Sequence, residues 1–184
     1  MRYAKLIMVT GDNNNKFYEM TWDGKSPNFN VKYGRVESTS QDVTYPSYKW
    51  DSKYNEKVKK GYKDVTDLVA DSVVEVKKEK VVYEDIKDAK VAQFITLMKQ
   101  YTDGLVSKTY SVKSDKVSIK QVNEAQGILD DISTLAKAKK RDKLAINTKL
   151  LELYMVIPRF MKDVRVAILP HIDLDSTLVQ EQAN

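Results

Sequence analysis

The stretch FNVKYGRVES, residues 29–38, places an aromatic ring, a glycine and a guanidinium in direct succession at Tyr33, Gly34 and Arg35. Apolar and polar residues alternate before them, a period-two pattern that is typical of a half-buried β-strand. A glycine inside a strand marks a bulge or a close approach by another group. The stretch therefore raises the question of what approaches the backbone between a ring and a cation.

The residue types needed for self-contained catalysis are scarce. His171 is the only histidine, and it follows Pro170 near the end of the chain, so we interpret it as a loop residue. Adjacent acidic pairs such as Asp130 and Asp131 diverge on a helix and do not form paired catalytic carboxylates. The absence of cysteine excludes disulfides and thiolate metal sites. Neither Gly-rich nucleotide-binding motif, GxGxxG or GxxxxGK[ST], occurs.

Composition indicates a globular protein with a modest positive charge. The 184 residues are 42% hydrophobic and 31% charged, which suits one compact domain or two small ones. Lys and Arg number 31 and Asp and Glu 26, so binding to an acidic partner requires clustering of the charge on one face. Without an 18-residue apolar run or a signal peptide, we expect an intracellular protein. It would be cytoplasmic in a prokaryotic or viral setting and nuclear in a eukaryotic one.

The first 69 residues predict a small antiparallel sheet with one helix. Three alternating segments, separated by turn-forming residues, indicate strands: 3–10, 16–22 and 29–37. In the segment 49–62, Trp50, Tyr54 and Val58 recur at helical spacing, and Gly61 is a plausible helix end. One helix over a small sheet is an α+β unit.

Beyond a charge-dense linker at residues 70–90, the apolar period becomes helical. The first helix presents one apolar face: Val91, Phe94, Ile95, Met98, Tyr101 and Leu105. Ser118 and Gln121 form a capping box that opens a second helix. The face of this second helix consists of Val122, Ala125, Leu129, Ile132 and Ala136.

The basic run 137–143 predicts a turn into a third helix, which Pro158 ends. A short last helix is expected from Thr177, capped by Asp175 or Ser176. We expect the interior of the resulting bundle to contain Phe94, Met98, Leu129, Ile132, Leu151 and Tyr154. The fold class is therefore α+β, a small antiparallel sheet with one packed helix, followed by an all-α helical bundle. The domains are residues 1–69, a linker at 70–90, and a helical domain at 91–184 that we expect to be truncated.

Three blocks of the first module match a known domain in order. Residues 13–22 (NNNKFYEMTW) resemble an Asn-rich turn and strand, and residues 49–62 (KWDSKYNEKVKKGY) resemble a helix, of the WGR domain. This domain is named for its Trp-Gly-Arg motif and occurs in DNA-damage-dependent poly(ADP-ribose) polymerases. FNVKYGRVE resembles its signature strand, with Tyr33 in the tryptophan position and Gly34 and Arg35 retained.

The second module resembles the regulatory helical domain that precedes the catalytic domain in the same polymerases. The matching segments are 91–101 (VAQFITLMKQY), 115–132 (DKVSIKQVNEAQGILDDI) and 150–159 (LLELYMVIPR). Arg159 stands where histidine is usual, and the glycine of the family's Leu-Gly-Lys-Leu-Ser segment is absent.

The resemblance implies that the two modules have different functions. WGR domains in this family bind DNA at strand breaks, and the helical domain restrains an ADP-ribosyltransferase domain until DNA binds. The implied partners are therefore DNA with strand breaks and that transferase domain, in cis or in trans, and no membrane. The chain ends before a transferase with its His–Tyr–Glu constellation, so we expect no catalytic site here. NAD would be the cofactor of the absent domain.

The residues that suit DNA contact under this resemblance are Arg35, Tyr33, Gly34, Lys16, Asn15, Asn14 and Lys32. Arg35 offers a rigid fork for a phosphate, and Tyr33 offers a ring for a base left unstacked at an end. Gly34 would allow close approach to the backbone. Residues 14–16 in the hairpin turn would contact phosphates, which position a protein without specifying sequence.

Each of these residues also has a structural interpretation. Tyr33 is alternatively a core aromatic residue, and Arg35 alternatively pairs with an acidic residue of the helical module as an interdomain strut. Gly34 would then be a bulge and residues 13–15 turn formers. The helical module is either a regulatory bundle or a general scaffold or oligomerisation unit. The alternative function is a protein–protein adaptor that binds no nucleic acid.

Overall fold

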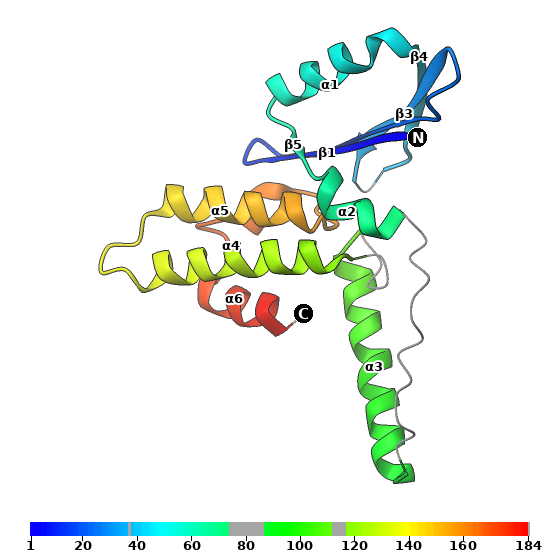
Figure 1. Cartoon of the computed structure of the whole chain (residues 1–184). Coiled ribbons are helices and arrows are strands. Elements are labelled where there is room, and N and C mark those ends of the chain that lie inside the picture. Colours follow the sequence, from blue (N-terminus) through cyan, green and yellow to red (C-terminus); the bar gives the residue numbers. More distant parts are fainter. Residues whose placement is uncertain (37, 74–86, 112–116, 184) are drawn as a thin grey trace.

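The computed structural model describes residues 1–36, 38–73, 87–111 and 117–183 (Figure 1). Its N-terminal part is a five-stranded antiparallel sheet in the order β4-β3-β2-β1-β5. The strands are β1 (Arg2–Thr10), β2 (Asn14–Trp22), β3 (Asn28–Arg35), β4 (Gln41–Pro46) and β5 (Lys63–Asp64). The three strands expected from alternation correspond to β1, β2 and β3, whereas β4 was not predicted.

Two tight turns set the register of the first three strands. Asn13 has φ 65 between β1 and β2, a left-handed conformation that asparagine tolerates better than most residues. Between β2 and β3, Gly24 has φ 83, and the Asp23 carboxylate accepts hydrogen bonds from the backbone N–H groups of Lys25 and Ser26 at 2.8 and 2.7 Å. The resulting pairing places Tyr33 opposite Tyr18.

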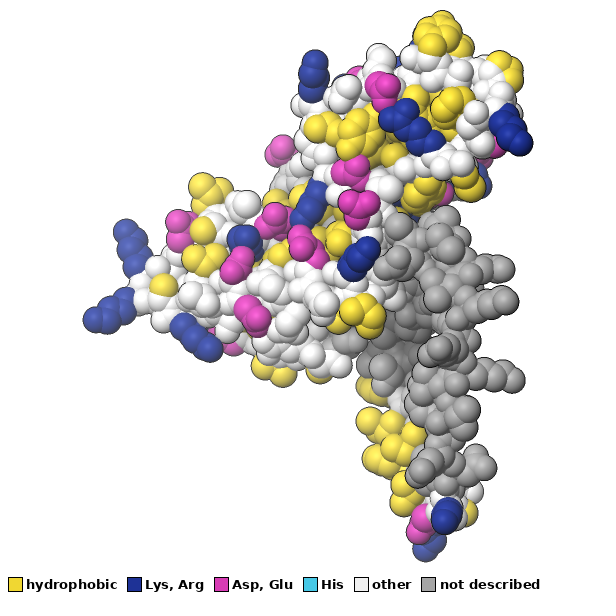
Figure 2. Space-filling model, viewed as in Figure 1, with side chains coloured by type: hydrophobic (Ala, Val, Ile, Leu, Met, Phe, Trp, Pro, Cys, Tyr) yellow, Lys and Arg dark blue, Asp and Glu magenta, His cyan; other side chains and the backbone are white. Residues whose placement is uncertain are grey.

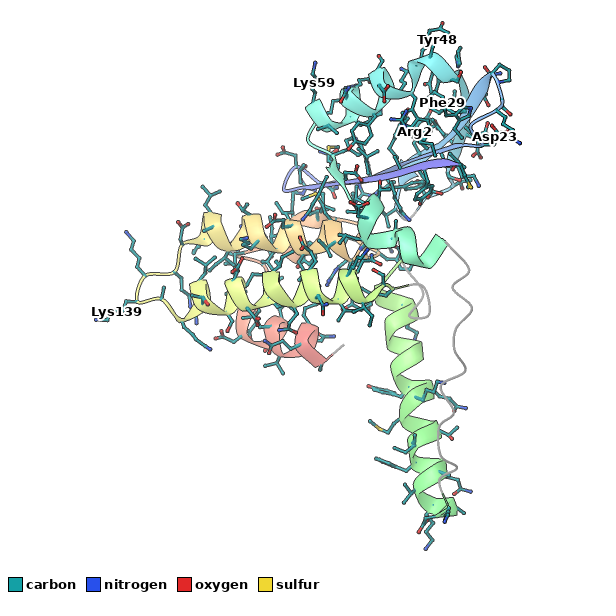
Figure 3. All side chains as sticks on the ribbon, viewed as in Figure 1. Arg2, Asp23, Phe29, Tyr48, Lys59 and Lys139 are labelled. Atoms are coloured by element: carbon teal, nitrogen blue, oxygen red, sulfur yellow. The ribbon has the colours of Figure 1, made fainter. Side chains whose placement is uncertain are left out.

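One face of the sheet is covered by helix α1 (Trp50–Lys59), which follows the 3₁₀ turn η1 (Ser47–Lys49). Trp50 is 3% exposed, and its ring lies 5.0 Å from that of Phe29, which projects toward α1 (Figure 3). The apolar cluster here also contains Ala4, Leu6, Tyr18, Met20 and Val31. Gly61, with φ 86, follows the helix as expected.

The other face of the sheet packs on the helical region. This region comprises α2 (Thr66–Val73), α3 (Ala89–Thr109), α4 (Ile119–Lys137), α5 (Lys143–Val156), the 3₁₀ turn η3 (Val164–Ala167) and α6 (Leu174–Ala183). Ile7 and Val9 of β1 belong to the same core as Leu129, Ile132 and residues of α5 and α6. Figure 1 shows α4 and α5 side by side beneath the sheet. The expected fold class, an α+β sheet unit followed by helices, is confirmed.

Of two predicted helix caps, the one at α4 is confirmed and the one at α6 is wrong. The Ser118 side chain accepts from the Gln121 N–H, and the Gln121 side chain accepts from the Ser118 N–H, so the capping box is confirmed. The last helix begins at Leu174 rather than Thr177. Its cap is Asp173, whose carboxylate accepts from the Asp175 N–H at 3.2 Å and from the Ser176 hydroxyl at 2.8 Å. Neither residue expected as the cap has that role.

The predicted boundary at residues 69 and 70 falls inside α2, which continues to Val73, and α3 begins at Ala89. The remainder of the predicted linker lies outside the described residues. The expected bundle interior needs a correction, because Phe94 and Met98 of α3 are 60% and 47% exposed. The helices that share a core are α4, α5 and α6, and α3 projects away from them (Figure 1). Val122, also expected on a packed face, is 49% exposed.

Candidate nucleic-acid interface

A hollow of about 330 Å³ lies beside the end of β3 and the C-terminal half of α1. It brings together Lys16, Tyr33, Gly34 and Arg35 from the predicted set. Helix α1 adds Lys57, and Tyr62, three residues after the end of α1, adds another ring. None of the residues that line this hollow is acidic. We call it the β3–α1 hollow.

Tyr33 packs at the edge of the α1-side core and also lines the hollow. Its ring packs against the cross-strand neighbour Tyr18, with the ring centroids 6.1 Å apart, and it belongs to the edge of the α1-side core. The side chain is only half-buried, so part of the ring also lines the hollow. A Cβ at Gly34 would lie 3.5 Å from the Thr39 carbonyl oxygen and 3.6 Å from the Phe17 ring, which are ordinary contacts. An alanine therefore fits at this position without displacing the backbone.

Lys57 supplies a cation that was not among the predicted site residues. Its Nζ lies 4.4 Å from the ring centroid of Tyr18 and 5.8 Å from that of Tyr62, within cation–π range. Burial lowers the pKa of Lys57, and the charges of Lys60, Lys53 and Lys16 lower it further, while Glu56 opposes them. The signal in the sequence was helical spacing: Lys57 follows Trp50 by seven residues, so it lies on the sheet-facing side of α1.

Arg35 lines the hollow but already has hydrogen-bond partners. Its guanidinium donates to the Asn13 carbonyl and side-chain oxygens at 2.8 and 3.0 Å. It also donates to the carbonyl oxygens of Met161 and Lys162 at 2.9 and 2.8 Å. The interdomain strut considered from the sequence is thus present in this geometry, with backbone carbonyls in place of the expected carboxylate. Arg35 joins the sheet to the segment between α5 and η3.

Two predicted DNA contacts of the hairpin turn are occupied within the fold. Asn15 is 0% exposed, and its side-chain N–H group donates to the Arg159 carbonyl at 3.0 Å. A phosphate cannot reach a buried amide, so Asn15 is corrected from a DNA contact to an interdomain contact. Asn14 is half-buried and donates to the Thr10 hydroxyl at 2.8 Å, which closes the hairpin.

Lys32 is exposed but lies on the opposite side of the sheet from the β3–α1 hollow, because alternate residues of a strand face opposite ways. Its cross-strand neighbours are Glu19 on β2 and Asp42 on β4. Two carboxylates beside it reduce the positive potential there. The structure therefore brings Lys16 and Arg35 together but leaves Lys32 outside the cluster.

A second cation lies between aromatic rings, in the helical region. The Arg159 guanidinium is 5.0 and 4.3 Å from the ring centroids of Tyr110 and Tyr154. It pairs with both oxygens of Glu181 on α6, at 2.5 and 2.9 Å, and Arg159 is 7% exposed. Burial lowers the pKa of Arg159, but its hydrogen bonds and charge pairing with Glu181 raise the pKa above the ordinary value. This closed cluster connects α6 to the end of α5.

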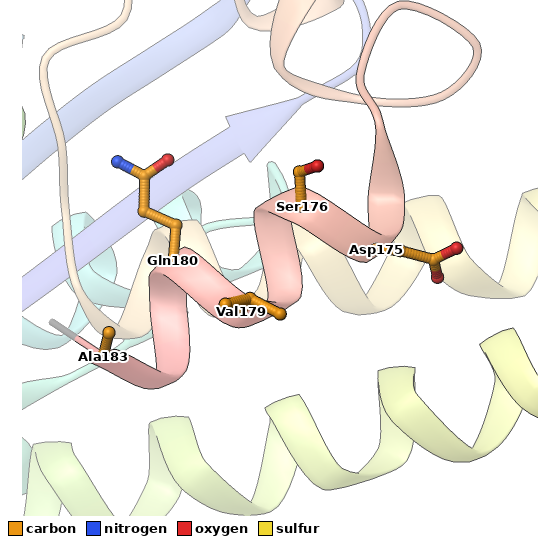
Figure 4. A pocket seen from close by; sticks show the side chains of 5 residues that line it. All are labelled: Asp175, Ser176, Val179, Gln180 and Ala183. Atoms are coloured by element: carbon orange, nitrogen blue, oxygen red, sulfur yellow. The ribbon is translucent and has the colours of Figure 1, made fainter.

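The remaining surface offers weaker candidates. A shallow hollow on α6 is lined by Asp175, Ser176, Val179, Gln180 and Ala183 (Figure 4). These side chains all come from one helix, so no second element faces a ligand. Within the described ranges, no group of three His, Cys, Asp or Glu side chains is placed to hold a metal ion. His171 is exposed in the loop before α6. None of the helices, as far as the structure describes them, is long and apolar enough to cross a membrane.

Comparison with known proteins gives one informative match. No family model matches the chain. It is 44% identical over 182 residues to "Uncharacterized protein 101L" of Invertebrate iridescent virus 6, a match covering 99% of this chain and 74% of that protein. The similarity therefore spans both the sheet unit and the helical region. The chain belongs to the same family as this iridescent virus protein.

Proposed function

We propose that this chain binds DNA at ends or nicks through the β3–α1 hollow. The observation that carries the proposal is the composition of the lining, in which three cations and four aromatic rings meet without a carboxylate. The cations Lys16, Arg35 and Lys57 suit phosphates, and the exposed part of the Tyr33 ring suits the face of a base. A base inside a duplex has neighbours on both faces, whereas the terminal base pair leaves one face free. The hollow therefore favours broken over intact duplex.

The contacts available in the hollow carry no base-sequence information. Cations that meet phosphates position the protein on the backbone, and stacking tolerates every base because each has a π-face. Binding would be salt-dependent, because each phosphate contact releases condensed counterions. We therefore expect end-selective but sequence-independent binding.

The regulatory part of the proposal concerns the helical region. We propose that α4–α6 restrain an NAD-dependent ADP-ribosyltransferase domain, in cis or in trans, as the family resemblance implies. The support is Arg35, which lines the hollow and also donates to the Met161 and Lys162 carbonyls. A phosphate in the hollow competes with those carbonyls for the same guanidinium. DNA binding would thereby loosen the contact between the sheet and the segment that leads to α6.

Fluorescence anisotropy with labelled DNA tests the binding proposal. A nicked duplex, a blunt duplex and a closed circle of the same sequence are compared over a range of salt concentrations. We expect the broken forms to bind at least tenfold more tightly than the closed circle. Equal affinity for all three would overturn end recognition.

Matched variants then locate the site. Tyr33→Ala should weaken binding to broken duplex by about tenfold, in line with ~1–3 kcal/mol for one stacked base. Lys57→Met should also weaken it, most strongly at low salt, because it removes one phosphate contact. Lys32→Met removes an exposed lysine from the other side of the same strand, so it should change affinity less than twofold. If Lys32→Met has the same effect as Lys57→Met, the hollow is not the binding site.

The alternative function is a protein–protein adaptor without nucleic-acid binding. The observation that favours it is a row of exposed apolar side chains on α3, of which Phe94 is 60% and Tyr101 65% exposed. The two functions are separable, because an adaptor would show no affinity for any of the three DNA forms even at low salt.

A further inference from the structure

Helix α3 exposes an apolar stripe to solvent between residues 91 and 101. The exposed fractions are 48% for Val91, 60% for Phe94, 49% for Ile95, 64% for Leu97 and 65% for Tyr101. Figure 1 shows the helix extending away from the sheet and from α4–α6, and Figure 2 shows hydrophobic side chains gathered along one side of it. We call these residues the α3 stripe.

The stripe belongs to a well-formed helix rather than to a frayed segment. The Asp88 carboxylate accepts hydrogen bonds from the backbone N–H groups of Lys90 and Val91 at 2.8 and 3.2 Å, which is the geometry of an N-cap. Residues 91, 94, 98, 101 and 105 are apolar, and their alternating steps of three and four are those of a coiled-coil seam. The far side of the helix is polar, with Gln93, Thr96 and Gln100.

The size of the stripe suits a weakly associating pair of copies. A fully accessible aromatic side chain presents about 150–250 Å², so Phe94 and Tyr101 at 60% and 65% exposure contribute roughly 200–300 Å² per helix, and the three aliphatic side chains add roughly 100–200 Å². Two stripes facing each other would bury roughly 600–1,000 Å² in total, the size of a weak, concentration-dependent contact. Contiguous apolar patches of this size on a protein surface mark interaction sites.

The charges beside the seam favour a second copy over a charged partner. The positions that flank the seam between residues 91 and 101 are Ile95 and Leu97, neither of which is charged. Like charges therefore do not oppose each other along this part when two identical helices meet. The charged residue Lys99 lies on the opposite side of the helix by its period. We propose that the α3 stripe is a self-association surface that pairs with α3 of a second copy of this chain.

Cysteine cross-linking of the full chain tests this pairing directly, because the chain contains no cysteine. Met98 lies midway between residues 91 and 105, so a Met98→Cys variant would meet its own copy in either a parallel or an antiparallel pair. We expect mild oxidation at micromolar concentration to give mostly disulfide-linked dimer. Gln100→Cys on the polar side is the matched control and should remain mostly monomeric.

Sedimentation velocity on the reduced, unmodified chain gives an independent measurement. We expect the sedimentation coefficient to rise with concentration between about 1 and 100 μM, and Phe94→Glu to abolish this rise. Thr96→Glu, on the polar side, should leave it unchanged, which separates loss of association from loss of folding. A monomer at every concentration, or equal cross-linking at Met98→Cys and Gln100→Cys, would overturn the proposal. The proposal does not depend on DNA binding, and either one can fail without the other.

Discussion

Arg159 and Lys57 each lie against two tyrosine rings, and their surroundings differ in one respect. Arg159 is enclosed between two rings in the helical region and pairs with Glu181. Lys57 lies over the Tyr18 ring at the open β3–α1 hollow, whose lining contains no carboxylate. The cation therefore has a directly bonded carboxylate in one region, whereas in the other the Glu56 charge acts on it from outside the lining of the hollow.

The pKa values of Arg159 and Lys57 shift in opposite directions. Burial acts on both groups by disfavouring the charged form. Glu181 reverses the effect at Arg159, whose pKa is raised, whereas the pKa of Lys57 stays lowered. The closed cluster is thus a structural feature. If DNA binds in the hollow as proposed, a phosphate would stabilise the charged form of Lys57 in the way that Glu181 stabilises that of Arg159.

The largest expected effect comes from breaking the closed cluster. Glu181→Ala leaves the Arg159 guanidinium, 7% exposed, without its charge partner. Removing one partner of a buried ion pair costs ~3–5 kcal/mol, so urea denaturation should show a loss of that order in the free energy of unfolding. Asp51→Ala removes the exposed carboxylate that pairs with Arg2 at 2.7 Å and serves as the control, with less than ~1 kcal/mol expected. Equal losses for both variants would remove the distinction between closed and exposed pairs.

Arg35 both lines the β3–α1 hollow and holds the sheet to the helical region, so its substitution tests the two roles together. Arg35→Ala removes the hydrogen bonds to Asn13, Met161 and Lys162. Charged hydrogen bonds of this kind support a loss of about 2 kcal/mol in unfolding free energy, together with weaker DNA binding. The discriminating measurement is affinity at a temperature where the variant is fully folded. Unchanged affinity there would leave Arg35 as a strut only.

Lys57→Met tests whether the cation at the β3–α1 hollow contacts a phosphate. The variant keeps the aliphatic packing and removes the charge, so stability should change by less than ~1 kcal/mol. The slope of log affinity against log salt should fall by about one, as expected for loss of one phosphate contact. A slope equal to that of the unmodified chain would show that Lys57 makes no phosphate contact.

The pH dependence of DNA binding provides a related prediction. Because the pKa of Lys57 is lowered, the free protein loses this charge at a lower pH than an ordinary lysine does. Affinity should therefore be full below that pKa and fall as pH rises through it. In Lys57→Met this component of the decline should be missing. The measurement is anisotropy between about pH 7 and pH 10, within the range where lysines with lowered pKa titrate.

The smallest expected effect concerns the exposed ion pair between Asp163 and Arg165. Hydrogen bonds from the side chain and backbone of Arg165 lower the pKa of Asp163 to about 2. A lowered carboxylate pKa contributes stability at higher pH, and that contribution is lost as pH falls from about 4 toward 2. The melting temperatures of the unmodified chain and Asp163→Asn should therefore differ slightly at pH 5 and converge near pH 2. A gap that persists at pH 2 would point to packing rather than charge.

The sequence predicted features that depend on local pattern. Alternation identified β1, β2 and β3, and the Ser118 capping box identified the start of α4. It missed β4, because the strand is short, ends in Pro46 and has no buried residue. It also placed the face of α3 in a bundle, because an apolar helical period does not specify what covers it.

The candidate site was only partly predictable for a related reason. Tyr33 and Arg35 lie on β3 and Lys16 on β2, where it pairs with Arg35, so the register of two neighbouring strands keeps them close. The buried partner of Asn15 and the Met161 and Lys162 carbonyl partners of Arg35 are more than 120 positions away, which no local pattern reveals. Lys32 was predicted as a DNA contact because of its charge. Its position in the strand places it on the opposite face from Tyr33 and Arg35.

The packing of β1 against α5 has a consequence for how the chain folds. Ile7 and Val9 belong to one core with Ile146 and Leu150, so the first strand completes a hydrophobic core whose other half is synthesised about 140 residues later. Contacts of such high sequence separation are slow to form, because the entropy of closing a long loop is lost before the contact is gained. During synthesis, the face of the sheet that carries Ile7 and Val9 would remain uncovered until the helices have been made. Separate expression of the residues from α4 onward would leave their core without the strand that completes it.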